Sequence, residues 1–333
     1  MTNIYLIRHG EAEGNAFRRL HGQYDSLLTP RGHRQVECLR RRFENIHIDA
    51  CFASDLTRAS LTSKAIYEPK GLKLHRDCRF REVDVGCWED LPYGYLKHFE
   101  PELMRLFDED PRVWHVEGSE TYEEYTGRFL QGLTEAAERF DGGTIAVFAH
   151  GAAIRSTLIR LFFMDDISKL PYSDNTGVSL LRYENGNFSY EFINDNSHIP
   201  GELSRFYLQR RLKEMGCEGE STVYFEAVKE SCDIVTIAAL LKGREVGRMT
   251  LGQPQGNTAI VLNMTLDPAM EGRRYTDQML GEVFSRARKQ GCENVQLMPG
   301  AYPEDIITRY EFDPGSLKRS IDVHVYRWEE ATC

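Results

Sequence analysis

IYLIRHG, residues 4–10, is the stretch that decides the fold of this 333-residue chain. Four apolar residues run without interruption and end in the polar triplet RHG. A second run, IAVFAHG over residues 145–151, likewise ends in histidine and glycine. Short unbroken apolar runs are typical of strands buried on both faces, as in a parallel sheet covered by helices. The two stretches therefore predict two inner strands of one sheet.

Helical patterns separate these strands. The best marked begins at Thr29-Pro30, an N-cap residue followed by proline at the first helical position. The expected helices cover about residues 29–43, a segment that starts near 54 after a strand at 50–53, residues 121–140, and a segment that follows residue 150. Strands that alternate with helices predict an α/β domain of three layers, with a mostly parallel sheet covered by helices.

The rest of the chain predicts a hairpin and then a second domain. Residues 177–193 read as two strands around the turn ENGN. A helical connector follows, and then strand patterns at 223–227, 259–266 and 294–298 with a helix near 277–290. We therefore predict a first domain over 1–200, a connector over 201–220, and a smaller α+β domain over 221–333.

Composition narrows the classes of function. The net charge is −10, which argues against nucleic acid as a partner, because phosphate-backbone binding depends on clustered lysine and arginine. No stretch is long and apolar enough to suggest a signal peptide or a membrane span. The eight cysteines form no C-x-x-C pair, so we expect no zinc site and a reducing, cytoplasmic location. The sequence is compatible with a homo-oligomer.

Basic side chains gather where strands of the predicted sheet end. Arg8 and His9 end one strand, His150 ends another, and Arg58 lies in the helix that follows a third. Ligands of doubly wound sheets bind at these strand ends, and glycine after the histidine, as at Gly151, lets the backbone approach a ligand. Two guanidiniums and two imidazoles suit a phosphate. A metal site is the competing interpretation, but the neighbouring arginines would repel a divalent cation.

The ordered motifs around these residues resemble those of the histidine phosphatase superfamily, in its metal-independent branch that includes phosphoglycerate mutase-like phosphatases. The first motif is LIRHGEAEGN, residues 6–15, and the resemblance continues to about residue 199. Further matching elements are Gly22, Asp25, 28–29, Gly32, Gln35, SDLTRA at 54–59 with Thr62, FREVDVGCWE at 80–89, EGSE at 117–120, Arg128, AHG at 149–151, and Asn194 with His198.

This resemblance implies a role for each matching residue. His9 would be the nucleophile and become phosphohistidine, and Glu82 would give a proton to the leaving oxygen. Arg8, Arg58 and His150 would hold the phosphoryl oxygens, with Asn15 as a further contact. The chemistry agrees, since phosphoryl transfer depends mostly on positioning and electrostatic stabilisation. An acid such as Glu82 must be protonated near neutral pH, which requires burial or nearby phosphate charge.

Two positions depart from the family pattern. His21 stands where relatives commonly carry glutamine or threonine, in the loop expected to line the substrate, and it is a candidate substrate contact. Asp90 follows Trp88-Glu89 where many relatives have glycine, so the local turn is expected to differ. The segment after Glu82 resembles the phosphatases more than the mutases, which favours hydrolysis. A phosphoglycerate mutase-type phosphotransferase is the alternative.

The C-terminal segment resembles the GNAT acyltransferases in the order of its strands and helix and in Tyr310. That family binds the pyrophosphate of coenzyme A on a glycine-rich loop that opens a helix. Here the loop reads EGRRYTD, residues 271–277, in which Tyr275 and Asp277 stand where glycines would be. An aspartate would repel phosphate. We therefore expect a degenerate loop and no cofactor.

Three functions for the whole chain follow from these patterns. The first is a phosphatase of a small phosphorylated metabolite with a degenerate acyltransferase-like domain. The second is a bifunctional phosphatase and acyltransferase, and the third is a sensor or scaffold without turnover. The complete set of expected catalytic residues favours the first, without naming the phosphomonoester.

Overall fold

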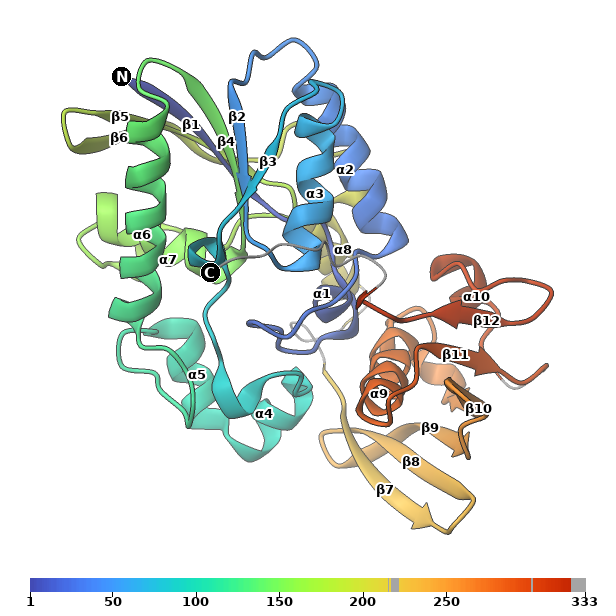
Figure 1. The fold of residues 1–333 in the computed structure, drawn as a ribbon. Coiled ribbons are helices and arrows are strands. Elements are labelled where there is room, and N and C mark those ends of the chain that lie inside the picture. Colours follow the sequence, from blue (N-terminus) through green and yellow to red (C-terminus); the bar gives the residue numbers. More distant parts are fainter. Residues whose placement is uncertain (215, 217–221, 301, 325–333) are drawn as a thin grey trace.

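The computed structural model describes residues 1–214, 216, 222–300 and 302–324, which build two sheets with covering helices (Figure 1). The elements of the N-terminal part are β1 (Thr2–Arg8), α1 (Glu13–Phe17), α2 (Pro30–Arg42), β2 (Ala50–Ala53), α3 (Thr57–Tyr67), β3 (Leu74–Arg76), α4 (Tyr93–Phe99), α5 (Pro101–Glu109), α6 (Tyr122–Arg139), β4 (Thr144–Ala149), α7 (Gly151–Phe162), β5 (Val178–Glu184) and β6 (Asn187–Asp195). Those that follow are α8 (Arg205–Glu214), β7 (Tyr224–Glu230), β8 (Ile234–Leu241), β9 (Arg244–Gly252), β10 (Thr258–Leu266), α9 (Tyr275–Lys289), β11 (Asn294–Leu297), α10 (Asp305–Arg309) and β12 (Lys318–Ser320).

The N-terminal sheet has the strand order β3-β2-β4-β1-β5-β6. Strands β3, β2, β4 and β1 run parallel, whereas β5 is antiparallel to β1 and β6 to β5. The sheet is therefore mixed: four strands have the parallel pairing that the sequence predicted, and an antiparallel hairpin lies at one edge. The hairpin predicted from the ENGN turn consists of β5 and β6 and belongs to the same sheet. Its first strand pairs with β1 on the side away from β4, where Val178 lies opposite Ile7.

Helices cover both faces of this sheet, which gives the α/β fold that the sequence predicted. Helices α6 and α7 pack on one face through residues such as Phe129 and Leu158. Helices α2 and α3 cover the other face through residues such as Leu39 and Ile66. Thr29 caps α2 by accepting a hydrogen bond from the Gly32 N–H. The sequence patterns did not predict α1, α4 or α5.

The C-terminal sheet has the strand order β12-β11-β10-β9-β8-β7. Its only parallel pair among the described strands is β10 with β11. Helix α9 packs on this sheet through apolar residues that include Met279 and Val283. The strand patterns expected at 223–227, 259–266 and 294–298 correspond to β7, β10 and β11, and the helix expected near 277–290 is α9.

The two parts of the chain share packed surfaces. Phe17 at the end of α1 is buried among C-terminal residues, with its ring 5.3 Å from that of Phe284. His98 of α4 stacks on Tyr224 of β7 at 4.3 Å. Phe17 belongs to α1 and Phe284 to α9, so these two helices are in contact. This contact is important for the site, because α1 also borders the cavity described next.

None of the described helices combines the length and apolar character needed to cross a bilayer.

Candidate active site

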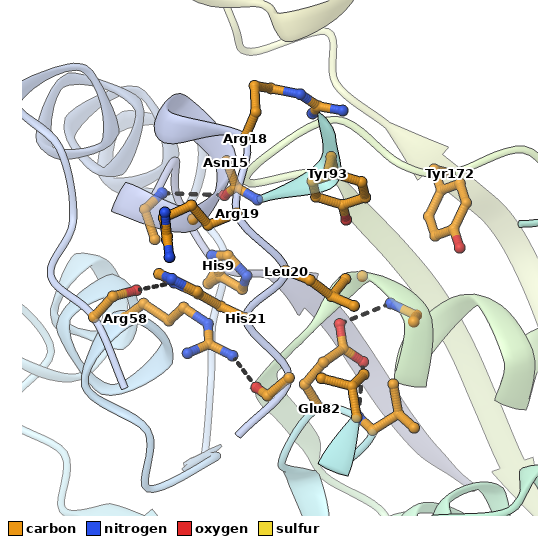
Figure 2. Close-up of a pocket in the computed structure, with 18 of the residues that line it drawn as sticks. His9, Asn15, Arg18, Arg19, Leu20, His21, Arg58, Glu82, Tyr93 and Tyr172 are labelled. Carbon is orange, nitrogen blue, oxygen red and sulfur yellow. Dashed lines mark hydrogen bonds between the residues drawn. The ribbon is translucent and has the colours of Figure 1, made fainter. Parts of the chain in front are cut away.

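The ends of β1, β4 and β2 open on one cavity of about 270 Å³ (Figure 2). These three strands are neighbours in the sheet, so their carboxyl ends meet at one edge. Most of the residues that the sequence singled out line this cavity, namely Arg8, His9, Asn15, His21, Arg58, Glu82 and Gly151. His150 does not line it but lies directly beside His9, with ring centroids 5.1 Å apart.

His9 is held in the form that a nucleophile needs. Its Nδ1 lies 2.7 Å from the carbonyl oxygen of Gly10. Because a carbonyl only accepts, Nδ1 carries the proton and Nε2 keeps a free electron pair. Burial, and then the positive charges of Arg58 and Arg8, lower the pKa of His9 well below its usual value. The imidazole is therefore neutral at physiological pH.

His150 is fully buried at the N-terminus of α7. Among the described residues neither of its ring nitrogens has a hydrogen-bond partner. Burial and the charge of Arg58 also lower the pKa of His150 well below its usual value. A buried polar group without a partner is costly, so an oxygen of a bound ligand is its natural partner.

Arg8 and Arg58 bring two buried positive charges to the cavity. Arg8 donates from Nη1 to the carbonyl of Ser173 at 2.5 Å. Burial, together with the charge of Arg205, lowers the pKa of Arg8 to about 10, so it stays protonated at neutral pH. Arg58 donates to the carbonyls of Tyr24 at 3.0 Å and Gly22 at 2.6 Å. Such fixed guanidiniums bind phosphate oxygens without reorganisation.

Glu82 lies at the wall of the cavity that the N-terminus of α7 forms (Figure 2). Its Oε1 accepts from the backbone N–H groups of Ala153 at 2.7 Å and Val83 at 3.1 Å, and Oε2 accepts from Ala152 at 2.9 Å. A carboxylate offers about four lone-pair positions. One position, on Oε2, is thus left to exchange a proton with a ligand.

Asn15 is oriented by its neighbours so that its amide can serve a ligand. Its Oδ1 accepts from the N–H of Ala12 and from Nδ2 of Asn175, both at 3.1 Å. Its Nδ2 is then the group left for the cavity. Asn175 also donates to the carbonyl of His9 at 3.2 Å, so the loop around it orients two site residues. Sequence patterns missed this loop, which carries no motif.

His21 lines the cavity, but both of its ring nitrogens are already used. Nδ1 lies 3.1 Å from Oγ of Ser26, and Nε2 lies 3.2 Å from Oδ1 of Asp90. Burial lowers the pKa of His21 against the opposing effect of Asp90, so the ring is neutral. Nε2–H then donates to Asp90, and the Ser26 hydroxyl donates to Nδ1. In this arrangement the imidazole holds the loop rather than offering a donor to the ligand.

The outer wall contains residues that the sequence did not single out. They are Arg18, Tyr93, Lys97, Tyr172 and, from helix α8, Arg205 and Gln209. The guanidinium of Arg18 lies 4.6 Å from the centre of the Tyr93 ring. No periodic pattern or motif marks these positions, because they meet only through the folding of distant segments.

The described part of the chain contains no group of three or more metal-binding side chains that could hold an ion. Arg8, Arg58 and Glu82 line the cavity together with His9, and His150 lies beside His9. Two fixed positive charges next to a neutral imidazole suit a phosphoryl group that is transferred to nitrogen.

Comparison with known proteins gives a family match over the same region. Residues 4–196 match the model of the histidine phosphatase superfamily (branch 1). Phosphoserine phosphatase 1 of Hydrogenobacter thermophilus is 27% identical over 210 residues, which are 63% of this chain and 98% of that protein. A probable phosphoglycerate mutase of Salmonella choleraesuis is 31% identical over 154 residues, 46% of this chain and 72% of that protein.

Solved structures resemble the same part of the fold. Bacillus stearothermophilus YhfR has a TM-score of 0.58 and 26% identity, and the match covers 60% of this chain and all of that one. A mycobacterial glucosyl-3-phosphoglycerate phosphatase has a TM-score of 0.54 and 22% identity over 58% of this chain and 99% of its own, a likeness of fold.

Proposed function

Because this chain belongs to the histidine phosphatase superfamily (branch 1) and is a phosphatase, we propose that it hydrolyses a small phosphorylated metabolite without a metal, through a phosphohistidine on His9. One observation carries this proposal. The hydrogen bond from Nδ1 of His9 to the Gly10 carbonyl leaves Nε2 unprotonated, in the cavity that Arg8 and Arg58 make positive.

In the first step the P–O bond to the leaving group breaks as the P–N bond to Nε2 of His9 forms. Arg8, Arg58 and His150 take up the charge of the phosphoryl oxygens. Glu82 gives its proton to the leaving oxygen, which departs as an alcohol. Covalent transfer divides one difficult displacement into two easier ones.

In the second step water attacks the phosphohistidine. Glu82, now ionised, accepts a proton from the water, and the P–N bond breaks to return neutral His9 and release phosphate. The same carboxyl group therefore acts as acid and then as base. Its position beside the amides of Ala152 and Ala153 holds it in place for both steps.

Hydrolysis of an aryl phosphate in the presence of EDTA tests the proposal. We expect full activity with the chelator and a loss of at least about a thousandfold in His9→Ala, as for removal of a nucleophile. Quenching the Glu82→Gln variant in alkali should trap a phosphoenzyme that acid then hydrolyses, as expected for a P–N bond. The matched control is His47→Ala, an exposed histidine outside the cavity. Activity that survives His9→Ala, or that chelation removes, would contradict the proposal.

A phosphoglycerate mutase-type transfer is the second candidate, favoured by the relative that carries that name. The two reactions differ in what attacks the phosphoenzyme, a water molecule or a second hydroxyl. Incubation with a phosphoglycerate and analysis of the products separates them. Release of inorganic phosphate supports hydrolysis, whereas an isomeric phosphoglycerate supports the mutase. A panel of phosphorylated metabolites then identifies the substrate.

For the C-terminal part we propose a GNAT-like fold over 221–333 that follows a connector over 201–220 and does not bind coenzyme A. In the loop where that family binds pyrophosphate, Asp277 is fully buried and ion-paired with Arg274 and Arg309. In these ion pairs Asp277 neutralises the two arginine charges that could otherwise bind a pyrophosphate. We also propose a cytoplasmic location, because the described cysteines are free thiols.

A further inference from the structure

The loop of residues 18–24 connects the outer wall of the cavity with the phosphate site. Its last carbonyls, those of Gly22 and Tyr24, accept the two hydrogen bonds that orient the Arg58 guanidinium. The carboxylate of Glu89 holds the same turn by accepting from the backbone N–H groups of Gly22 and Tyr24. The position of Arg58 therefore depends on the position of loop 18–24.

Asp90 holds the first half of this loop. Its backbone N–H donates to the carbonyl of Leu20 at 2.8 Å, and its Oδ1 takes hydrogen bonds from Nε of Arg19 at 2.7 Å and Nε2 of His21 at 3.2 Å. Asp90 is only 2% exposed and has a φ of 60°, the left-handed region that favours glycine. Its side chain must offset that strain by these contacts.

Helix α9 of the C-terminal part completes this buried group. Ser285 donates from Oγ to Oδ2 of Asp90 at 2.5 Å and accepts from Nη2 of Arg19 at 3.0 Å. Glu282, one turn earlier, accepts from Nη1 of Arg19 at 2.7 Å. The side chains of Arg19 and Asp90 are 4% and 3% exposed. Without α9 they would keep their charges but lose buried partners, which is costly.

A close crossing of two helices brings these partners together. A Cβ atom on Gly281 would lie 2.4 Å from Cβ of Phe17, so α9 approaches α1 only because residue 281 has no side chain. Helix α1 also carries Asn15, which lines the cavity. Gly281 lies one residue before Glu282 and four residues before Ser285 in α9. The crossing therefore holds this segment of α9 against the N-terminal part (Figure 1).

We propose that helix α9 sets the geometry of the phosphatase pocket, with Ser285 and Glu282 as positioning residues that act through Arg19 and Asp90 on loop 18–24 and thereby on Arg58. The expected effect on turnover rests on the proposed function. The orientation of the Arg58 guanidinium by the C-terminal part should also change the affinity for phosphate itself, whether or not the chain turns over a substrate.

The test uses the full chain with Ser285→Ala, Glu282→Ala and Glu282→Gln. Glutamine keeps an acceptor for Arg19, whereas alanine removes it. Two quantities are measured, kcat/KM for an aryl phosphate and the Kd of inorganic phosphate by calorimetry. For each alanine variant we expect kcat/KM to fall and the Kd to rise by about tenfold, the effect of one charge-assisted hydrogen bond. Glu282→Gln should recover most of both.

The matched control is Ser231→Ala, which removes an exposed hydroxyl at the turn between β7 and β8 of the same C-terminal part. We expect it to leave both quantities unchanged. Gly281→Ala provides a second, independent variant. It retains every polar partner and favours the helix itself, yet it must push α9 away from Phe17. The same rise in the Kd of phosphate is expected.

Wild-type values of kcat/KM and of the phosphate Kd in Ser285→Ala and Glu282→Ala would overturn the inference. So would a loss of thermal stability with an unchanged phosphate Kd, because that result assigns these residues a purely structural role. If instead the wild-type chain binds phosphate but hydrolyses no phosphomonoester, the proposed function fails while the phosphate Kd of the variants still decides this inference.

Discussion

Phe17→Ala is the substitution that best measures how strongly the two parts of the chain depend on each other. Phe17 is 2% exposed, and the cluster around it consists mostly of C-terminal residues. Its ring makes aromatic contacts with Phe284 at 5.3 Å and with Tyr310 at 5.2 Å. The substitution therefore removes apolar contact across the interface and leaves the core of the N-terminal sheet intact.

The size of the effect follows from these contacts. Removing a buried phenyl ring costs about 3–5 kcal/mol, which includes the cavity that remains. The two aromatic pairs, of about 0.5–1.5 kcal/mol each, place Phe17 in the upper half of that range. The expected loss in the free energy of unfolding is thus about 4–5 kcal/mol. Because Phe17 contacts both parts, most of this loss should fall on their association.

Urea unfolding followed by two probes measures this effect. Far-UV circular dichroism reports on both parts, and phosphatase activity reports on the N-terminal part with α9 docked against it. In the wild type we expect coincident transitions, whereas in Phe17→Ala the two should separate. The matched control is Phe43→Ala, an equally buried phenylalanine whose cluster lies within the N-terminal part. A loss below about 1 kcal/mol in Phe17→Ala, or transitions that still coincide, would refute the reasoning.

Three other predictions concern the phosphate site, pH and the C-terminal loop. A Cβ on Gly151 would lie 3.1 Å from Cζ of Arg8, so Gly151→Ala should weaken inhibition by inorganic phosphate several-fold without a change in Tm; unchanged inhibition would contradict this. Burial and the charge of Arg42 lower the pKa of His198 to about 4, so the unfolded state binds more protons between pH 6.5 and 4. The free energy of unfolding should therefore decrease as the pH is lowered from 6.5 to 4, and it should decrease less steeply in His198→Asn. Equal slopes of the two proteins in urea titrations would be evidence against this role of His198. Calorimetry with acetyl-CoA at millimolar concentration should show no binding, because Asp277 is paired in the loop, and micromolar binding would support the bifunctional alternative.

Much of the site could be predicted because its residues belong to local patterns. Apolar runs that end at His9 and His150 predict two inner strands of one sheet, and in the structure β1 and β4 are neighbouring parallel strands. Arg58 follows the next strand, β2, which lies on the other side of β4. The convergence of these side chains is thus a consequence of strand order. The resemblance supplied Asn15 and Glu82, and the structure places both at the same cavity.

Other parts of the site could not be predicted, because they depend on contacts between distant segments. Asn175 orients Asn15 across 160 positions of the sequence. The helices α4 and α5 were also missed, since each is short and neither has a side-chain N-cap. The place of the hairpin in the sheet was also not predicted, because the hairpin signal at 177–193 does not say which strand the hairpin joins.

The two departures from the family pattern, His21 and Asp90, have a common physical explanation. A glycine at position 90 would adopt the φ of 60° without strain, and an aspartate there requires compensation. His21 and Arg19 supply part of it from the same loop, and Ser285 and Lys289 supply more from the other part of the chain. Neither residue is explained by a role in the chemical step, since both nitrogens of His21 point to protein partners. Their presence follows instead from the docking of α9, because a charged, buried pair of Arg19 and Asp90 is stable only where a second surface completes its hydrogen bonds. The C-terminal part is therefore built into the geometry of the phosphatase pocket.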